Sequence, residues 1–172
     1  MPSHYTLRMQ FGTHQDADKV TEQLLKLVRT ARVDEVAVFF FAEEMNDGHE
    51  PLERIREWIE HSRPYRQALA AAGVAVSLNP WHSVLHCDRG RRMKPGQDWQ
   101  PMVDSNGGQC KAVVCPLDRG WRRYYEETLR MYAREGFRVV WIDDDIRYHN
   151  HRPLEWGGCF CEKATGKDGK LF

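Results

Sequence analysis

The chain has 172 residues, which is enough for one domain with a hydrophobic core of its own. Basic and acidic side chains balance at 25 each, which argues against a nucleic-acid-binding surface, because such a surface needs a basic excess. No apolar run approaches the roughly 20 residues that span a bilayer, and the first residues lack the basic start and apolar middle of a signal peptide. We therefore expect a cytoplasmic protein without a membrane partner.

Apolar periodicity predicts alternating strands and helices in the first half of the chain. Residues 4–12 alternate loosely between polar and apolar side chains, which indicates a strand. The continuous apolar run within the next strand is typical of a strand covered on both faces, as in a parallel sheet. After the first strand we expect a helix over 15–31 with Thr13 as its N-cap, a strand over 33–42, a helix from Pro51 to Gly73 that Pro64 breaks or kinks, and a strand over 74–78.

The second half of the chain continues the same alternation after a long polar segment. That segment is too polar for a core and long enough to be a functional loop. The expected elements are this loop over 83–109, a short extended piece at 112–115, a helix over 118–135 that Gly136 ends, and a buried fourth strand over 137–142.

The order of these elements predicts the fold class and the domain organisation. Strands that alternate with helices imply a parallel sheet with right-handed crossovers. We therefore expect an α/β fold of about four βα units in a single domain over residues 1–161. The polar residues 162–172 are expected to form a flexible C-terminal tail.

Polar side chains follow the expected strands at their carboxyl ends. The most unusual group is the triplet Asp143, Asp144 and Asp145, because adjacent carboxylates repel one another and cost several kcal/mol each to desolvate without partners. Active sites form at this face in a (β/α)8 barrel, and ligands bind at the same edge in an open doubly wound sheet. The other polar and aromatic residues at strand ends are Glu43, Glu44, Asn79, Trp81 and His82.

The residue types at these strand ends suit a carbohydrate ligand. Aromatic rings cover the apolar face of a pyranose, and carboxylates or amides bind its hydroxyl groups, while a pair of carboxylates is the usual machinery of glycoside hydrolysis. Each tryptophan also fits a core position, and the aspartates also fit capping or pairing with Arg147 or Arg152. The residues that point to a carbohydrate site are the acids above together with Trp81, Trp99, Trp141, Tyr148 and Trp156.

The segment Trp141-Ile-Asp-Asp-Asp145 and the later Cys159-Phe-Cys161-Glu resemble the fourth-strand region of family-42-type β-galactosidases and related clan-A glycoside hydrolases. The resemblance implies the N-terminal half of a TIM barrel, with Asp145 at the position of the general acid/base, where the family has Glu. It also implies that a cysteine-rich loop follows, which can hold zinc. By the same reading, Asp143 and Asp144 bind sugar hydroxyls or tune the proton, and the substrate pocket is lined by Glu43, Asn79, Trp81, His82, His149 and Asn150.

Five cysteines are an odd number without the spacing of a disulfide framework. Zinc usually takes four ligands, and Cys159 and Cys161 supply only two of them. We therefore predict no cofactor and no metal ligand among the site residues, with zinc at Cys159 and Cys161 as the alternative. The residues that could complete such a site are Cys87, Cys115, His149 and His151.

Two other function classes remain open at this point. One is a carbohydrate-binding module without catalysis, and the other is a metal-dependent hydrolase that uses Asp143–Asp145 with His149 and His151 as ligands. By the resemblance, the second catalytic carboxylate lies beyond residue 172, so the lone chain is expected to be catalytically weak. A half barrel also exposes its first and fourth strands, from which we expect self-association.

Overall fold

The computed structural model describes residues 3–40, 48–80, 92–142 and 158–166. None of the helices in these ranges is long and apolar enough to cross a membrane. The elements are, in chain order, β1 (Thr6–Gln10), α1 (Ala17–Thr30), β2 (Glu35–Phe40), α2 (Leu52–Ala71), β3 (Ala75–Pro80), β4 (Pro101–Val103), β5 (Gln109–Val114), α3 (Arg119–Ala133) and α4 (Glu162–Thr165).

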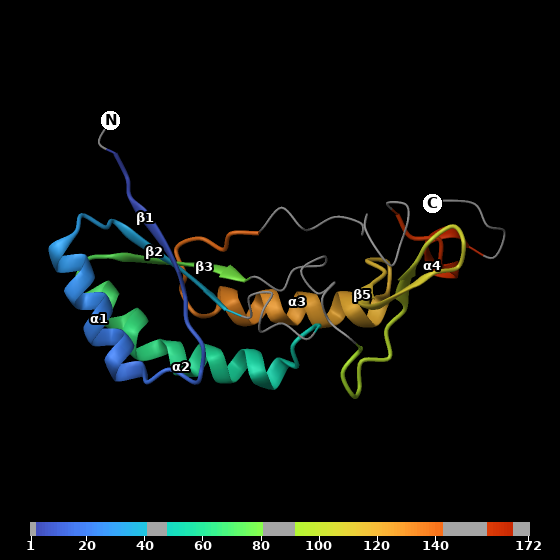
Figure 1. Cartoon of the computed structure of the whole chain (residues 1–172), viewed down its shortest axis with the longest axis horizontal. Helices are drawn as coiled ribbons and strands as arrows, with labels where there is room; N and C mark the ends of the chain where they lie inside the picture. The colour runs from blue at the N-terminus through green and yellow to red at the C-terminus, as the bar shows by residue number, and fades with distance from the viewer. Residues whose placement is uncertain (1–2, 41–47, 81–91, 143–157, 167–172) are drawn as a thin grey trace.

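The first three strands form a parallel sheet in the order β1-β2-β3, as their alternation with helices predicts. Val36 in the central strand pairs with Leu7 on one side and with Val76 on the other. Helices α1 and α2 lie side by side and cover one face of this sheet (Figure 1). The predicted α/β class and parallel pairing are therefore confirmed.

The core lies between this sheet and its helices. Val36, Val38 and Phe40 alternate along β2 and are at most 1% exposed. The Phe40 ring stacks on Trp58 of α2 with ring centroids 3.8 Å apart. The Trp58 indole N–H in turn donates to the Phe11 carbonyl oxygen at 3.0 Å, so burial leaves no unsatisfied donor on that ring.

The two helices on the sheet differ from their predictions in detail. Asp16, not Thr13, caps α1, because its carboxylate accepts the backbone N–H groups of Asp18 and Lys19. The predicted break at Pro64 is wrong, since α2 runs through it as one helix. Its flanking residues Tyr65 and Leu69 are fully buried, and this packing offsets the cost of about 3 kcal/mol for an interior proline.

The fourth segment lies parallel to β3, but it is not the buried strand that was predicted. The Leu78 N–H donates to the Val139 carbonyl at 2.9 Å, the Trp141 N–H donates to the Leu78 carbonyl at 2.7 Å, and an isolated bridge joins Leu78 to Val140. Trp141 and Ile142 are 49% and 45% exposed. Both side chains line a cavity and do not belong to the hydrophobic core.

Part of the predicted loop over 83–109 is a β-hairpin. Strands β4 and β5 pair antiparallel, and the extended piece predicted at 112–115 is the second half of β5. The buried Asp104 carboxylate closes the turn by accepting the N–H groups of Asn106 and Gly108 at 2.9 and 2.7 Å. A Cβ at Gly108 would lie only 2.8 Å from the Asp104 Oδ2, so glycine is required at this close approach.

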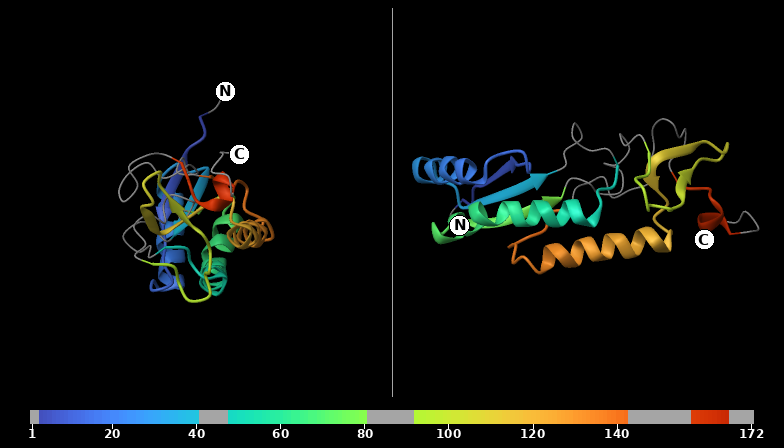
Figure 2. Two further views of the ribbon diagram at one scale, coloured as in Figure 1. Left: turned by 90° about the vertical axis from the view of Figure 1, so that its right-hand side faces the viewer. Right: turned by 90° about the horizontal axis from the view of Figure 1, so that it is seen from below.

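Helix α3 connects the two ends of an elongated molecule (Figures 1 and 2). The sheet with α1 and α2 forms one end, and the hairpin with α4 forms the other. Tyr132 of α3 packs edge-on against Phe40 of the sheet, and the Tyr124 hydroxyl donates to the Glu50 carbonyl at 2.7 Å. Helix α4 lies within the expected tail and buries Ala164.

Candidate functional site

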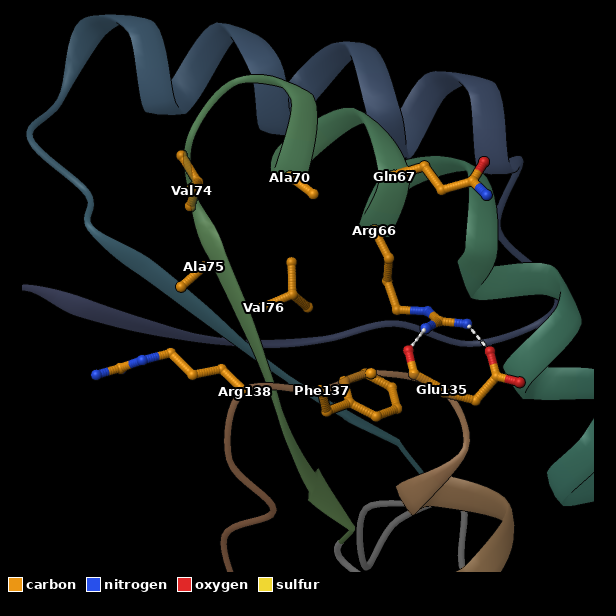
Figure 3. Close-up of a pocket in the computed structure, with 10 residues that line it drawn as sticks. Arg66, Gln67, Ala70, Val74, Ala75, Val76, Glu135, Phe137 and Arg138 are labelled. Carbon is orange, nitrogen blue, oxygen red and sulfur yellow. Dashed lines mark hydrogen bonds and ion pairs between the residues drawn. The ribbon is translucent and has the colours of Figure 1, made fainter.

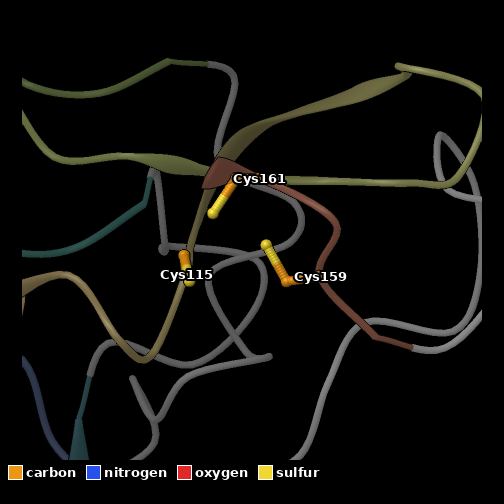
Figure 4. A group of neighbouring side chains, drawn as sticks. All are labelled: Cys115, Cys159 and Cys161. Carbon is orange, nitrogen blue, oxygen red and sulfur yellow. The ribbon is translucent and has the colours of Figure 1, made fainter. Parts of the chain in front are cut away.

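Three buried cysteines form the most concentrated group of metal-ligating atoms in the described part of the chain. The sulfurs of Cys115, Cys159 and Cys161 all lie within 4.8 Å of one another (Figure 4). Each of these side chains is at most 5% exposed, and each is a free thiol. The structure therefore adds a third thiol to the two that the sequence places close together.

Cys115 is held at the end of β5. Its backbone N–H donates to the Gln100 carbonyl at 2.8 Å, and its own carbonyl accepts the Asp118 N–H at 2.9 Å. The second bond closes a turn between the strand and helix α3, and Asp118 caps that helix by accepting the Trp121 N–H at 2.9 Å. The sulfur is thus fixed by the junction of two regular elements.

Cys159 and Cys161 reach the same place from the C-terminal segment. The Phe160 N–H between them donates to the Val103 carbonyl of β4 at 2.7 Å, which attaches this segment to the hairpin. The Cys161 carbonyl then accepts the Ala164 N–H at 2.9 Å and so begins the short helix α4. Residues on either side of Phe160 can therefore present their sulfurs to Cys115.

The pKa values of the three thiols are shifted in different directions. The Cys115 thiol donates a hydrogen bond to Cys159, and the N–H groups of Cys161 and Val103 add to it; together they outweigh burial and lower the pKa of Cys159 to about 5. The same hydrogen bond, reinforced by burial, raises the pKa of Cys115. Burial raises the pKa of Cys161 as well. The three thiols therefore titrate as one coupled group, in which these hydrogen bonds favour loss of the first proton from Cys159.

The geometry of the three sulfurs fits a tetrahedral metal ion. A Zn–S distance of about 2.3 Å corresponds to sulfur separations of about 3.8 Å in a tetrahedral site. The sulfurs lie within 4.8 Å of one another, so a contraction of about 1 Å would bring all three into coordination. Thiolate ligands suit zinc, copper(I) and iron–sulfur centres and do not suit magnesium or calcium.

An ion pair joins the two segments that carry the cysteines. Lys163 of α4 contacts the Asp118 carboxylate, which also accepts the Gln100 N–H at 3.1 Å. Burial raises the pKa of Asp118, but the Lys163 ammonium and the N–H groups of Trp121 and Gln100 outweigh it, so the pKa lies below its usual value. This carboxylate is 3% exposed and therefore carries its charge inside the protein.

The carboxyl edge of the sheet is a second candidate site. Asn79 at the end of β3 donates from its amide nitrogen to the Trp141 carbonyl at 3.0 Å, which ties the fourth segment to this edge. A cavity of about 310 Å³ extends across the sheet from Thr6, at the start of β1, to Asn79 and to Ile142, the residue before the aspartate triplet. The lining residues are Thr6, Arg8, Ala37, Asn79, Trp141 and Ile142.

Most of the site residues predicted from the sequence lie outside the described part of the chain. Asn79 is described, and it lines the cavity at the predicted edge. The residues outside the described ranges are Glu43, Trp81, His82, Asp143, Asp144, Asp145, His149 and Asn150, together with the possible metal ligands Cys87 and His151.

A cavity of about 320 Å³ lies beside the opposite end of β3, under α2 (Figure 3). Its charged groups already pair within the protein. Arg66 donates to a Glu135 carboxylate oxygen at 2.8 Å and covers the Phe137 ring, and Arg138 pairs with Glu35. We interpret this region as a structural contact between α2 and the segment that follows α3.

Comparison of the chain with protein-family models and with curated proteins finds no match to either. The resemblance to clan-A glycoside hydrolases therefore stays a prediction from the short segments 141–145 and 159–162. The structure shows the parallel order of strands β1, β2 and β3, and it places Cys115 beside Cys159 and Cys161.

Proposed function

We propose that Cys115, Cys159 and Cys161 bind one zinc ion that holds the C-terminal loop against the hairpin. The observation that carries this proposal is the position of the three buried sulfurs within 4.8 Å of one another. The low pKa of Cys159 supports it, because zinc binds the thiolate and displaces the remaining thiol protons.

A structural role suits this site better than a catalytic one. All three ligands are buried, and they join two chain segments that are far apart in sequence. Structural zinc sites are closed by four ligands, commonly cysteine and histidine. Three of them are described here; the fourth position is open to another side chain or to water.

Zinc titration of the reduced protein tests this proposal. Wild type should bind one equivalent, and Cys115→Ser should weaken binding by at least about tenfold because it removes one thiolate ligand. The matched control is Cys110→Ser, at a buried cysteine within strand β5 that is not one of the three clustered thiols. Wild-type affinity in Cys115→Ser, or equal losses in both variants, would contradict the site.

We further propose that the carboxyl edge of the sheet binds a carbohydrate, in a protein of glycoside hydrolase type built on part of a TIM barrel. The half-exposed Trp141 ring lines this cavity and suits the apolar face of a sugar ring, and the buried Asn79 amide holds the Trp141 backbone in place. The cysteine cluster supports the same proposal, since the resemblance implies a zinc-binding loop after the fourth strand. In this proposal Asp145 donates the proton to the leaving group.

Hydrolysis of aryl glycosides tests the second proposal, in a protein that carries the second catalytic carboxylate implied by the resemblance. If Asp145 is the general acid/base, Asp145→Asn should lower turnover by about 10²–10⁴, whereas Asp18→Asn on the exposed start of α1 should leave it unchanged. A loss below about tenfold would remove Asp145 from this role.

Two other outcomes would decide between the alternatives. Saturable sugar binding without turnover would favour a carbohydrate-binding module, and Trp141→Ala should then abolish that binding. Activity that falls on chelation and returns with Mn²⁺, in the Cys115→Ser background, would favour a metal-dependent hydrolase that uses the aspartate triplet.

A further inference from the structure

We propose that the ion pair between Lys163 and Asp118 positions the three cysteines and thereby sets the affinity of the metal site. This inference rests on the proposed zinc site and adds two residues that do not touch the metal. The two segments that carry the sulfurs meet at this pair, because Asp118 follows Cys115 in the turn before α3 and Lys163 follows Cys161 in α4.

The Asp118 carboxylate is the fixed half of the pair. One oxygen accepts the Trp121 N–H at 2.9 Å, and the other accepts the Gln100 N–H at 3.1 Å. Gln100 in turn accepts the Cys115 N–H through its carbonyl at 2.8 Å. The carboxylate and the Cys115 backbone are therefore anchored to the same residue, so a group that binds Asp118 is also placed relative to Cys115.

Lys163 is the half that belongs to the other segment. The Cys161 carbonyl caps the turn in which Lys163 lies, since it accepts the N–H groups of Ala164 and Thr165 at 2.9 and 3.0 Å. Contact between the ammonium and Asp118 therefore draws this turn, with Cys161 at its start, toward Cys115. The acceptor is 3% exposed, so the attraction is screened less than in a surface pair.

A pair that places the ligands in advance should strengthen metal binding. Without it, the metal ion must draw two separate segments together, and the cost of ordering them reduces the affinity. Groups that orient metal ligands from outside the coordination sphere typically change metal affinity by 10–100-fold when they are removed.

The experiment compares zinc affinity among lysine variants of the full chain, by competition with a chromophoric chelator. Lys163→Met removes the charge and keeps most of the aliphatic side chain, whereas Lys163→Arg keeps a cation that can reach Asp118. Lys111→Met is the matched control, because Lys111 is an exposed lysine on β5 of the same hairpin. Asp118 is left intact, since it also caps α3.

We expect Lys163→Met to weaken zinc binding by about 10–100-fold, with Lys163→Arg and Lys111→Met within about threefold of wild type. Thiolate-to-metal absorption of the Co²⁺-loaded protein should show the same number of bound thiolates in every variant at saturation. If wild type binds zinc and Lys163→Met binds it with the same affinity, the proposed role of the ion pair is wrong, while the zinc site itself stands. A wild-type chain that binds no zinc would contradict the zinc site itself.

A second measurement separates an effect of Lys163 on the stability of the metal-free protein from its effect on the position of the cysteines. Melting of the metal-free proteins should show Lys163→Met to be less stable than Lys111→Met, because Lys163→Met leaves the buried Asp118 carboxylate without its cation. A large loss of metal-free stability together with wild-type zinc affinity would show a purely structural ion pair and overturn the proposal.

Discussion

The two ends of the molecule differ in the contacts that stabilise each of them. The sheet with α1 and α2 encloses a continuous apolar core in which Val36, Ile55, Tyr65, Leu69 and Leu78 have no exposed surface. The hairpin with the C-terminal segment also buries apolar side chains, among them Met102, Val113 and Val114, and adds three clustered thiols and an ion pair with a buried carboxylate. The first arrangement is stabilised mainly by burial of apolar surface, whereas the proposed zinc ion would join the two segments of the second.

The largest expected effect is on the apolar end. Trp58→Ala should lower the free energy of unfolding by about 3–5 kcal/mol, because it leaves a cavity beside Phe40 and deprives the Phe11 carbonyl of its donor. Denaturant unfolding measures this loss. The control is Trp141→Ala, which should cost less than about 1 kcal/mol because that ring is 49% exposed.

This variant also tests the division of the molecule into two parts. If the two ends are independent, Trp58→Ala should bind zinc with wild-type affinity under conditions in which it stays folded. A loss of zinc affinity in Trp58→Ala that matches its loss of stability would show that the two ends form one cooperative unit, contrary to our comparison.

A smaller effect is expected at the buried Glu35, which is the principal charged group of the apolar end. Its carboxylate accepts hydrogen bonds from Ser77 and Arg138 and lies 2.8 Å from the His4 Nε2. Glu35→Gln should cost about 1–3 kcal/mol, since it weakens all three contacts in a buried position. Glu22→Gln, on the exposed side of α1, is the matched control.

The Glu35 contribution should depend on pH in a definite direction. Burial raises its pKa, but the hydrogen bonds from Ser77 and His4 and the charge of Arg138 outweigh it, so the folded pKa lies below the ordinary 4.5. The stabilisation is therefore present above pH 4.5 and is lost as the pH falls through the folded pKa. The stability difference between wild type and Glu35→Gln should shrink over that range, and a constant difference would contradict this account.

The fold of the apolar end follows from local patterns in the sequence. The apolar run in β2 and the helical spacing of Val20 and Leu24 predict a sheet covered by helices, and both are found. The fourth segment shows where such patterns fail. Val139–Ile142 is as apolar as a buried strand, yet periodicity does not say which neighbours cover it, and Trp141 is half exposed.

The cysteine cluster of the proposed zinc site could be predicted only in part. The closeness of Cys159 and Cys161 is visible in the sequence, and Cys115 is one of several residues that could join them. The choice among these depends on the pairing of β4 with β5, which lies in a stretch too short and too polar to be predicted as strands. The ion pair of Lys163 with Asp118 could not be predicted, since a lysine in a polar segment is usually solvated.

X-ray absorption at the zinc edge of the zinc-loaded wild-type protein tests the central claim most directly. We predict at least three sulfur neighbours of the zinc ion at about 2.3 Å, and one fewer in Cys115→Ser. A first shell of nitrogen and oxygen without sulfur, or a spectrum that Cys115→Ser leaves unchanged, would contradict a zinc site at Cys115, Cys159 and Cys161.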